Sequence, residues 1–286
     1  GKDLGGNDTL DSDADQTTGK TIQTVLDSGE SDKSWDAGIA ANANSLKASI
    51  GDKVWCDTNY NGIQDSGESG ISGVTVKLLN SGGTVLATTT TNASGNYLFS
   101  NLNAGDYKVQ VVKPTGYYYT KPNIGTNDSI DSDVDSTGKT ALTNLTTGEN
   151  DLTWAAGLYK KCSIGDRVWE DKDRDGIQDT GEGGIGSVKV SLQNASGTTI
   201  ATTTTNTSGN YSFTNLDPGT YRLVFDKTKT VYNNIAMSKW YGAGKDAGSN
   251  DAIDADATST SNVATTAYTT LTSGENDKTW DAGITP

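Results

Sequence analysis

Two long internal copies of one sequence constrain the fold of this chain more than any other feature. The segment SIGDKVWCDTNYNGIQDSGE, which begins at Ser49, matches SIGDRVWEDKDRDGIQDTGE, which begins at Ser163, and the match continues without a gap through GNYLFSNLNAGDYKVQV and GNYSFTNLDPGTYRLVF. The later parts also correspond, ending in TWAAGLY and TWDAGIT. Such self-similarity indicates one structural unit repeated along the chain. We predict two complete repeats, at 49–160 and 161–286.

A partial third copy precedes them. Residues 1–40 contain GGNDTLDSDADQTTGKT and LDSGESDKSWDAGIA, which match only the second half of a repeat. We interpret 1–40 as the C-terminal part of a preceding β-sandwich repeat and 41–48 as a linker. We expect truncation of a longer secreted protein rather than strands donated to another domain, because orphan strands would expose edges that normally need a partner.

Short alternating segments predict an all-β fold. GVTVKLLN, GTVLATTTT, GNYLFSNL and GDYKVQVV alternate apolar and polar residues and are bounded by Gly, Asn or Ser, which is typical of strands. Nothing sustains a helical period. Their spacing predicts tandem antiparallel, Ig-like β-sandwich modules of about seven strands. Large aromatic side chains are usually buried, so we expect a core position rather than sugar stacking for Trp55, Trp154, Trp169 and Trp280.

Composition limits the classes of partner that we expect for this chain. The 286 residues are 33% hydrophobic and have a formal net charge of -14, with no histidine. This could suggest disorder, but the tryptophans and tyrosines recur in register. Nucleic acids and anionic membranes need a basic surface, so we expect neither as a partner, and no stretch has the ~20 apolar residues of a membrane span. The acidity favours divalent cations.

Two twelve-residue loops have the spacing of a calcium-binding loop. Acidic or amide side chains stand at positions 1, 3, 5, 9 and 12, with glycine at position 6 and a residue that offers its backbone carbonyl at position 7. The first loop supplies Asp57, Asn59, Asn61, Ile63, Asp65 and Glu68. The second supplies Asp171, Asp173, Asp175, Ile177, Asp179 and Glu182. The alternative is a polar turn, since Asp, Asn and Gly dominate turns. We take Ca²⁺ as the predicted cofactor.

A second acidic cluster recurs in all three copies. Its residues are Asp8, Asp11, Asp13 and Asp15 in the front segment, Asp128, Asp131, Asp133 and Asp135 in the first repeat, and Asp251, Asp254 and Asp256 in the second. Carboxylates this close repel one another unless a cation or solvent screens them. One interpretation is a second calcium site, completed by Glu149 or Glu275 or by the twelve-residue loop. The alternative is a solvated loop.

These residues resemble a known family. The run IGDKVWCDTNYNGIQDSGESGISGVTVKLL followed by GNYLFSNLNAGDYKVQV resembles the B repeats of bacterial serine-aspartate repeat adhesins, over essentially all of 49–286. That family is similar in fold to collagen-adhesin B-type modules of the prealbumin-like kind. The resemblance implies calcium-stabilised stalk modules at the extracellular surface of bacteria, and the loop ligands named above carry over position by position.

The two cysteines, Cys56 and Cys162, lack counterparts in the other repeat. An odd strand count places the end of the first strand near the exit of the first module. We therefore predict a Cys56–Cys162 disulfide that pins the linker in an oxidising compartment, with two free thiols as the alternative.

Three classes of function remain. No histidine, nucleophile elbow or phosphate loop supports an enzyme. We predict a calcium-rigidified structural repeat of a surface stalk, fibre or filament, whose partners are neighbouring repeats or identical chains. The alternatives are a module that binds a glycan or matrix protein through variable aromatic loops, such as GYYYT at 116–120, and a noncatalytic appendage of a secreted enzyme.

Overall fold

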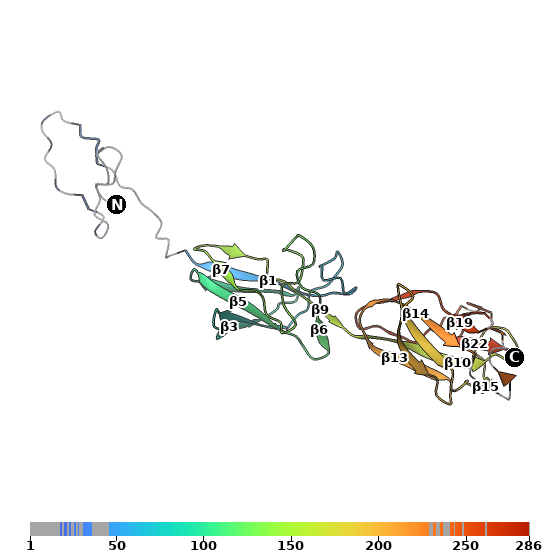
Figure 1. The fold of residues 1–286 in the computed structure, drawn as a ribbon. Coiled ribbons are helices and arrows are strands. Elements are labelled where there is room, and N and C mark those ends of the chain that lie inside the picture. Colours follow the sequence, from blue (N-terminus) through green and yellow to red (C-terminus); the bar gives the residue numbers. More distant parts are fainter. Residues whose placement is uncertain are drawn as a thin grey trace. The chain divides into compact units, whose positions relative to one another are not determined.

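Alternating apolar and polar side chains produce the strands of both complete repeats. The structure is a computed structural model that describes residues 46–228, 231–232, 235–236, 241–242, 244–247, 249–260 and 262–285, together with positions 18, 20–21, 23, 26, 28 and 31–35. Two units, 1–47 and 48–286, are described separately. Every regular element among the described residues is a strand (Figure 1). The predicted all-β class is confirmed.

Nine strands form the first module. They are β1 (Ala48–Cys56), β2 (Thr75–Asn80), β3 (Val85–Thr90), β4 (Asn96–Leu102), β5 (Gly105–Val112), β6 (Tyr117–Tyr119), β7 (Thr143–Leu145), β8 (Asn150–Asp151) and β9 (Ala156–Lys160). One sheet has the order β4-β1-β9-β6, with β8 also paired to β1, and the other has the order β3-β2-β5-β7.

The second module repeats this plan. Its strands are β10 (Cys162–Glu170), β11 (Lys189–Asn194), β12 (Thr199–Thr204), β13 (Asn210–Leu216), β14 (Gly219–Asp226), β15 (Val231–Tyr232), β16 (Ile235–Ala236), β17 (Tyr241–Gly242), β18 (Thr258–Ser259), β19 (Val263–Thr265), β20 (Thr269–Leu271), β21 (Asn276–Asp277) and β22 (Ala282–Thr285). The sheets have the orders β13-β10-β22-β17 and β12-β11-β14-β19-β18, while β15 and β16 form a separate pair.

One feature departs from the predicted antiparallel sandwich. The first strand of each module pairs in parallel with the last, β1 with β9 and β10 with β22. Cys56 is opposite Leu158, and Glu170 is opposite Ile284. Because the paired strands run the same way, the loop that follows the first strand lies at the end where the module exits.

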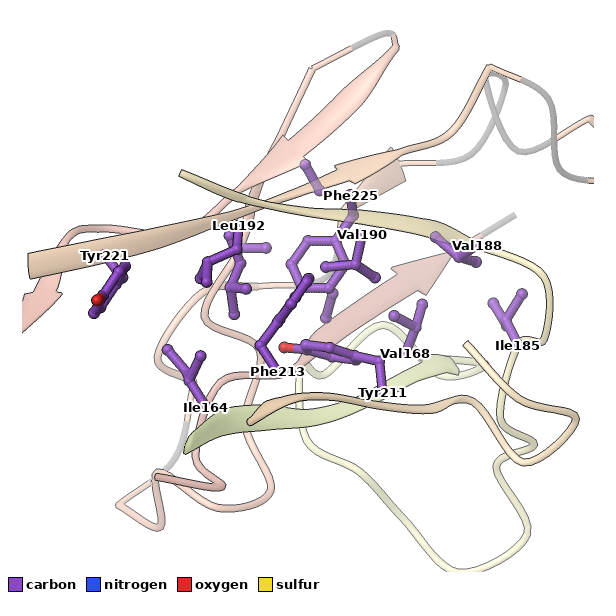
Figure 2. Close-up of a cluster of buried hydrophobic side chains, with 14 of the residues drawn as sticks. Ile164, Val168, Ile185, Val188, Val190, Leu192, Tyr211, Phe213, Tyr221 and Phe225 are labelled. Atoms are coloured by element: carbon purple, nitrogen blue, oxygen red, sulfur yellow. The ribbon is translucent and has the colours of Figure 1, made fainter. Parts of the chain in front are cut away.

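Each module encloses its own core between its two sheets. In the second module, Val168 of β10 and Phe213 of β13 face Val190 of β11 and Phe225 of β14 (Figure 2). The first module has the equivalent cluster, and no buried residue is shared between the two clusters. Side chains alternate along the strands, as in β13, where Tyr211 and Phe213 are buried and their neighbours are exposed. Such alternation is expected of a sheet with one solvated face.

The tryptophans occupy two kinds of position. Trp55 and Trp169 are fully buried, as predicted. Trp154 and Trp280 are partly buried and pack against the edge of their cores. The indole N–H of Trp154 donates to Asp151 at 2.7 Å, and that of Trp280 donates to Asp277 at 2.5 Å.

The same turn recurs in the front unit. Asp32 accepts hydrogen bonds from the Ser34 hydroxyl at 2.6 Å and from the Trp35 indole at 2.6 Å. These contacts reproduce the local geometry that precedes the last strand of each complete module.

Replacing buried Thr91 with valine should destabilise the first module by about 2 kcal/mol, because a buried polar group without a partner costs roughly 1–3 kcal/mol. The Thr91 hydroxyl donates to Ile71 O at 2.6 Å and accepts from Val74 N at 2.9 Å. Urea unfolding would measure the change. Thr88→Val, on the exposed part of β3, is the control; equal stability of the two variants would contradict the prediction.

Candidate metal centre

The first acidic loop begins where β1 ends. Asp57 is fully buried, and its backbone N–H donates to Leu158 O at 2.9 Å, which fixes the start of the loop to the last strand. One carboxylate oxygen of Asp57 accepts from Tyr60 N at 2.6 Å. The other accepts from Gly62 N at 2.9 Å and from the Thr120 hydroxyl at 2.5 Å. The loop therefore winds around a carboxylate at position 1.

The remaining predicted ligands of this loop converge. The side-chain amides of Asn59 and Asn61 both donate to Asp65 Oδ2 at 2.8 Å. Glu68 closes the loop: one of its oxygens accepts from Asp65 N at 3.1 Å and the other from Thr58 N at 2.6 Å. The side chains at positions 3, 5 and 9 thus contact one another, and the side chain at position 12 contacts the backbone at position 9.

Gly62 provides the sharp bend at position 6. Its φ of 86° lies in the left-handed region that favours glycine. A Cβ there would lie 2.6 Å from Lys121 O. The position therefore requires glycine on two independent grounds.

The second loop has the same geometry with more charge. Asp171 is fully buried and accepts from Arg174 N at 2.7 Å and from Gly176 N at 3.1 Å. Two overlapping groups have ligand atoms that all lie within 4.8 Å of one another: Asp171, Asp173 and Glu182, and Asp173, Asp175 and Asp179. Burial, followed by the neighbouring Asp175, raises the pKa of Asp179. Two acids here replace the two amides of the first loop.

The second acidic cluster also assembles. Ligand atoms of Asp128, Asp131 and Asp133 lie within 4.8 Å of one another. Asp131 is 4% exposed, and its Oδ1 is buried without a hydrogen-bond partner. Asp133 accepts from Ala155 N at 2.6 Å and lines a cavity of about 360 Å³ together with Asp128. A buried carboxylate oxygen that lacks a donor is the environment that a cation satisfies.

In the second module this cluster includes a residue that sequence analysis missed. Asp246, Asp254 and Asp256 form the corresponding group, and Asp246 also pairs with Lys245 Nζ at 2.6 Å. The predicted Asp251 contributes its charge nearby, since it raises the pKa of Asp256. Asp246 aligns with Asn123 of the first repeat, and both residues have a φ of 50°.

Backbone hydrogen bonds join the two acidic segments of each module. Ile63 is bridged to Asp131, and Ile177 is bridged to Asp254. In the first bridge, Gln64 N donates to Ile130 O at 2.6 Å and Ser132 N donates to Gly62 O at 3.2 Å. These bonds do not use the carbonyl of Ile63, the predicted ligand at position 7. Of the segments predicted to complete the second site, the twelve-residue loop lies beside the second acidic cluster.

The two glutamates have another role. Glu149 accepts from Thr146 N at 2.7 Å and from the Thr146 hydroxyl at 2.8 Å, and these bonds lower its pKa. Glu275 makes the same pair of bonds with Thr272. Both glutamates therefore cap their own turns.

Burial shifts the protonation of several carboxylates. It raises the pKa of Asp133 to about 8 and that of Asp256 to about 7. Asp281 is 1% exposed, and burial, followed by the charge of Asp256, raises its pKa to about 10. The first module has Ala155 at the position of Asp281. The second module therefore concentrates more acid near its last strand.

The predicted Cys56–Cys162 disulfide is wrong, because both cysteines are free. Cys56 does lie beside the exit of the first module, opposite Leu158. The Cys56 thiol donates to the Ser273 hydroxyl at 3.7 Å, while the buried Cys162 thiol donates to Thr272 O at 2.8 Å. Each thiol thus has its own hydrogen-bond partner in the segment that follows β20.

Some predicted residues lie outside the described part of the chain. They are Asp8, Asp11, Asp13 and Asp15, and most of the variable loop at 229–243. In the first module, the tyrosines of GYYYT form β6, which pairs with β9. Tyr118 is 40% exposed, whereas the hydroxyl of Tyr119 donates to Val111 O at 2.7 Å.

The fold and the acidic loops define a tandem β-sandwich repeat protein. The SdrD B-like domain family matches residues 48–158 and 162–284, and the chain belongs to this family. The predicted resemblance to serine-aspartate repeat proteins is thereby confirmed.

The chain spans only a small part of the length of the curated relatives that it matches. Serine-aspartate repeat-containing protein F of Staphylococcus epidermidis is 43% identical over 248 residues, which are 86% of this chain and 13% of that protein. Serine-aspartate repeat-containing protein C of Staphylococcus aureus strain Newman is 41% identical over 224 residues, covering 75% of this chain and 23% of that protein. Among solved structures, the streptococcal ancillary pilin matches with a TM-score of 0.31 and 12% identity, over 85% of this chain and 63% of its own.

Family membership indicates the cellular location of the protein. The family consists of extracellular surface modules and is not an enzyme family, so the predicted location at the cell surface is confirmed. Within the part of the chain that the structure describes, no helix is long and apolar enough to cross a membrane.

Calcium-free protein should lose stability as pH rises from about 4 to about 8. Raised pKa values of about 8 for Asp133 and about 7 for Asp256 mean that the native state holds protons which the unfolded chain releases near pH 4. The native state thus binds more protons across this range, so the free energy of unfolding falls as pH rises. Urea unfolding in EDTA at pH 5 and pH 8 would measure this. A higher midpoint at pH 8 would refute it.

Replacing Asp281 with alanine should stabilise the calcium-free second module by about 1 kcal/mol, because Asp281 Oδ1 is buried without a hydrogen-bond partner. Alanine is the residue of the first module at this position, so the strand accepts it. Calorimetry in EDTA at pH 8 would detect the change, with Asp106→Asn on the exposed part of β5 as the control. Destabilisation by Asp281→Ala would show that this carboxyl group supports the fold.

Proposed function

We propose that the chain is a calcium-stabilised structural repeat of an extracellular surface stalk, fibre or filament. The observation behind this proposal is that predicted oxygen ligands lie close together in each twelve-residue loop, and that the first ligand of each loop is hydrogen-bonded to the last strand of its module. Family membership supports the surface setting, and neighbouring repeats or identical chains are the proposed partners.

The residues fit a hard divalent cation. Calcium takes six to eight oxygen ligands at about 2.3–2.6 Å. The first loop would hold it through Asp57, Asn59, Asn61, Asp65, Glu68 and the carbonyl of Ile63. The second would use Asp171, Asp173, Asp175, Asp179, Glu182 and the carbonyl of Ile177. The clusters of Asp128, Asp131 and Asp133, and of Asp246, Asp254 and Asp256, are proposed as a further site in each module.

The expected effect of the ion is to lock the loop. In a calcium sensor, the response is a change in angle between two helices that flank the loop. Here the loop follows β1, its first ligand is bonded to β9, and its middle is bridged to Asp131. Binding would therefore crosslink three segments of one module without reorienting helices.

Calcium binding would contribute appreciably to the free energy of unfolding of a small module. Extracellular calcium sites commonly have a Kd of roughly 10⁻⁴ to 10⁻³ M. At ten times Kd, one site adds about 1.4 kcal/mol to the free energy of unfolding. A typical domain has about 5–15 kcal/mol in total, so a few sites change its stability substantially.

An adhesive role is the second candidate. Tyr118, which is 40% exposed, favours it, because exposed aromatic side chains contribute strongly to binding surfaces. Binding of purified glycans or matrix proteins, lost on Tyr118→Ala, would support this candidate. Assembly of chains without such a ligand would favour the structural role.

Removing calcium should lower the melting temperature of both modules by about 5 °C or more. Glu68→Gln should weaken the calcium response of the first module only, and Glu182→Gln that of the second only, because each glutamate supplies position 12 of its own loop and the second acidic cluster of each module is left intact. Calorimetry with calcium and with EDTA, together with isothermal titration, would measure these effects.

The matched control is Asp106→Asn, which removes one exposed carboxylate outside both clusters. It should leave the calcium response unchanged. Identical melts of the wild-type chain with calcium and with EDTA, and no heat of binding, would show that the loops are only polar turns.

A further inference from the structure

We propose that the first acidic loop is also half of the junction between the two modules, so that occupation of this loop by calcium determines how firmly the second module is held. This inference rests on the proposed calcium binding and goes beyond it. It assigns the exit end of the first module an interaction surface whose partner is the N-terminal end of the second module.

Thr58 links the loop directly to the second module. Its backbone N–H and its hydroxyl donate to Glu68 Oε1, at 2.6 and 2.8 Å. Its carbonyl accepts from Ser273 N at 2.9 Å, in the segment between β20 and β21. One residue is thus held on one side by the ligand at position 12 and on the other by the neighbouring module.

Tyr60 provides a second link. Its backbone N–H donates to Asp57 at 2.6 Å, and its φ of 60° lies in the left-handed region. Its ring lies 4.5 Å from that of Tyr159 in β9. The hydroxyl of Tyr159 donates to Asp217 Oδ1, between β13 and β14, at 2.5 Å. A chain of contacts therefore runs from the ligand at position 1 to the second module.

Charge and backbone contacts complete the surface. Lys161 Nζ lies 2.5 Å from the same oxygen of Asp217. Burial acts to raise the pKa of Asp217, but the hydrogen bonds from Lys161 and Tyr159 have the opposite effect. The pKa of Asp217 therefore lies below its ordinary value. Lys160 N donates to the Ser273 hydroxyl at 2.8 Å, and Gly274 N donates to Lys160 O at 3.2 Å. The junction thus combines a charged anchor with main-chain bonds.

These contacts belong to this pair of modules and not to the repeat in general. In the second module, Arg174 replaces Tyr60 and Thr285 replaces Tyr159. In the first module, Asn103 replaces Asp217 and Thr147 replaces Ser273. The tyrosine and lysine surface therefore occurs at the exit of the first module, and its aspartate partner occurs at the start of the second.

The loop of the second module serves as an internal control. Lys172 N donates to Glu182 Oε1 at 2.7 Å, as Thr58 does to Glu68. Loop 2 is at the opposite end of its module from Asp217 and Ser273, because it follows β10 and is bonded to β22. Its occupation should stabilise its own module without affecting the junction.

The experiment compares the orientations of the two modules by residual dipolar couplings in the full chain. With calcium, the couplings of both modules should fit one alignment tensor; in EDTA they should require two. Glu68→Gln should require two tensors even with calcium, whereas Glu182→Gln should retain one. Tyr159→Phe and Asp217→Asn, which leave every calcium ligand in place, should each require two tensors while calcium binding by titration is unchanged.

The outcomes separate this inference from the proposed function. If titration detects no calcium on the first loop, both fail. If calcium binds and raises the melting temperature of the first module, but Asp217→Asn combined with Tyr159→Phe keeps a single tensor, only the junction proposal is overturned. Because Tyr159→Phe keeps the buried ring and the side chain of Asp217 is 40% exposed, this double variant gives a result even if Glu68→Gln fails to fold.

Discussion

The parallel pairing of the first strand with the last is the contact on which the arrangement of each module depends. Cys56 lies opposite Leu158, and Asp57 begins the acidic loop immediately afterward. The pairing therefore delivers a cluster of oxygen ligands to the end of the module where the chain leaves. A purely antiparallel arrangement of these two strands would place that loop at the other end, away from the following module.

The second constraint on the fold is the burial of acidic side chains in each module. Each module keeps a fully buried aspartate at position 1 of its loop and two buried aspartates in its second cluster. Desolvation raises the pKa values of four of them, Asp131, Asp133, Asp171 and Asp256. Hydrogen bonds from backbone N–H groups compensate Asp57 and Asp133, whereas Asp131 Oδ1 has no such donor. The fold thus accepts an electrostatic cost at the place where a cation would remove it, which is typical of functional sites.

Much of the fold could be predicted from the sequence because its signals are local or repeated. Alternation predicts the strands, and the internal match predicts two equivalent modules. Asp246 escaped prediction because its position depends on a turn that brings residues from outside the acidic run toward Asp254, and the pattern of neighbouring aspartates contains no trace of that turn. The disulfide was wrong because the sequence predicted where the strand ends lie but not that the thiols of Cys56 and Cys162 would have separate partners, Ser273 and Thr272. The parallel pairing likewise depends on contacts between residues about a hundred positions apart.

The near identity of β1 and β10 has a consequence for biosynthesis. SIGDKVW and SIGDRVW are almost interchangeable, and each has a partner strand, β9 or β22, that carries a similar AGL or AGI sequence. Repeat proteins are prone to misassembly between neighbouring units of this kind. Synthesis from the N-terminus lessens the hazard, because β9 emerges before β10 and meets β1 alone. A full-length chain refolding from denaturant has no such order, so its strands compete, and folding on the ribosome should give a more uniform product than refolding in a test tube.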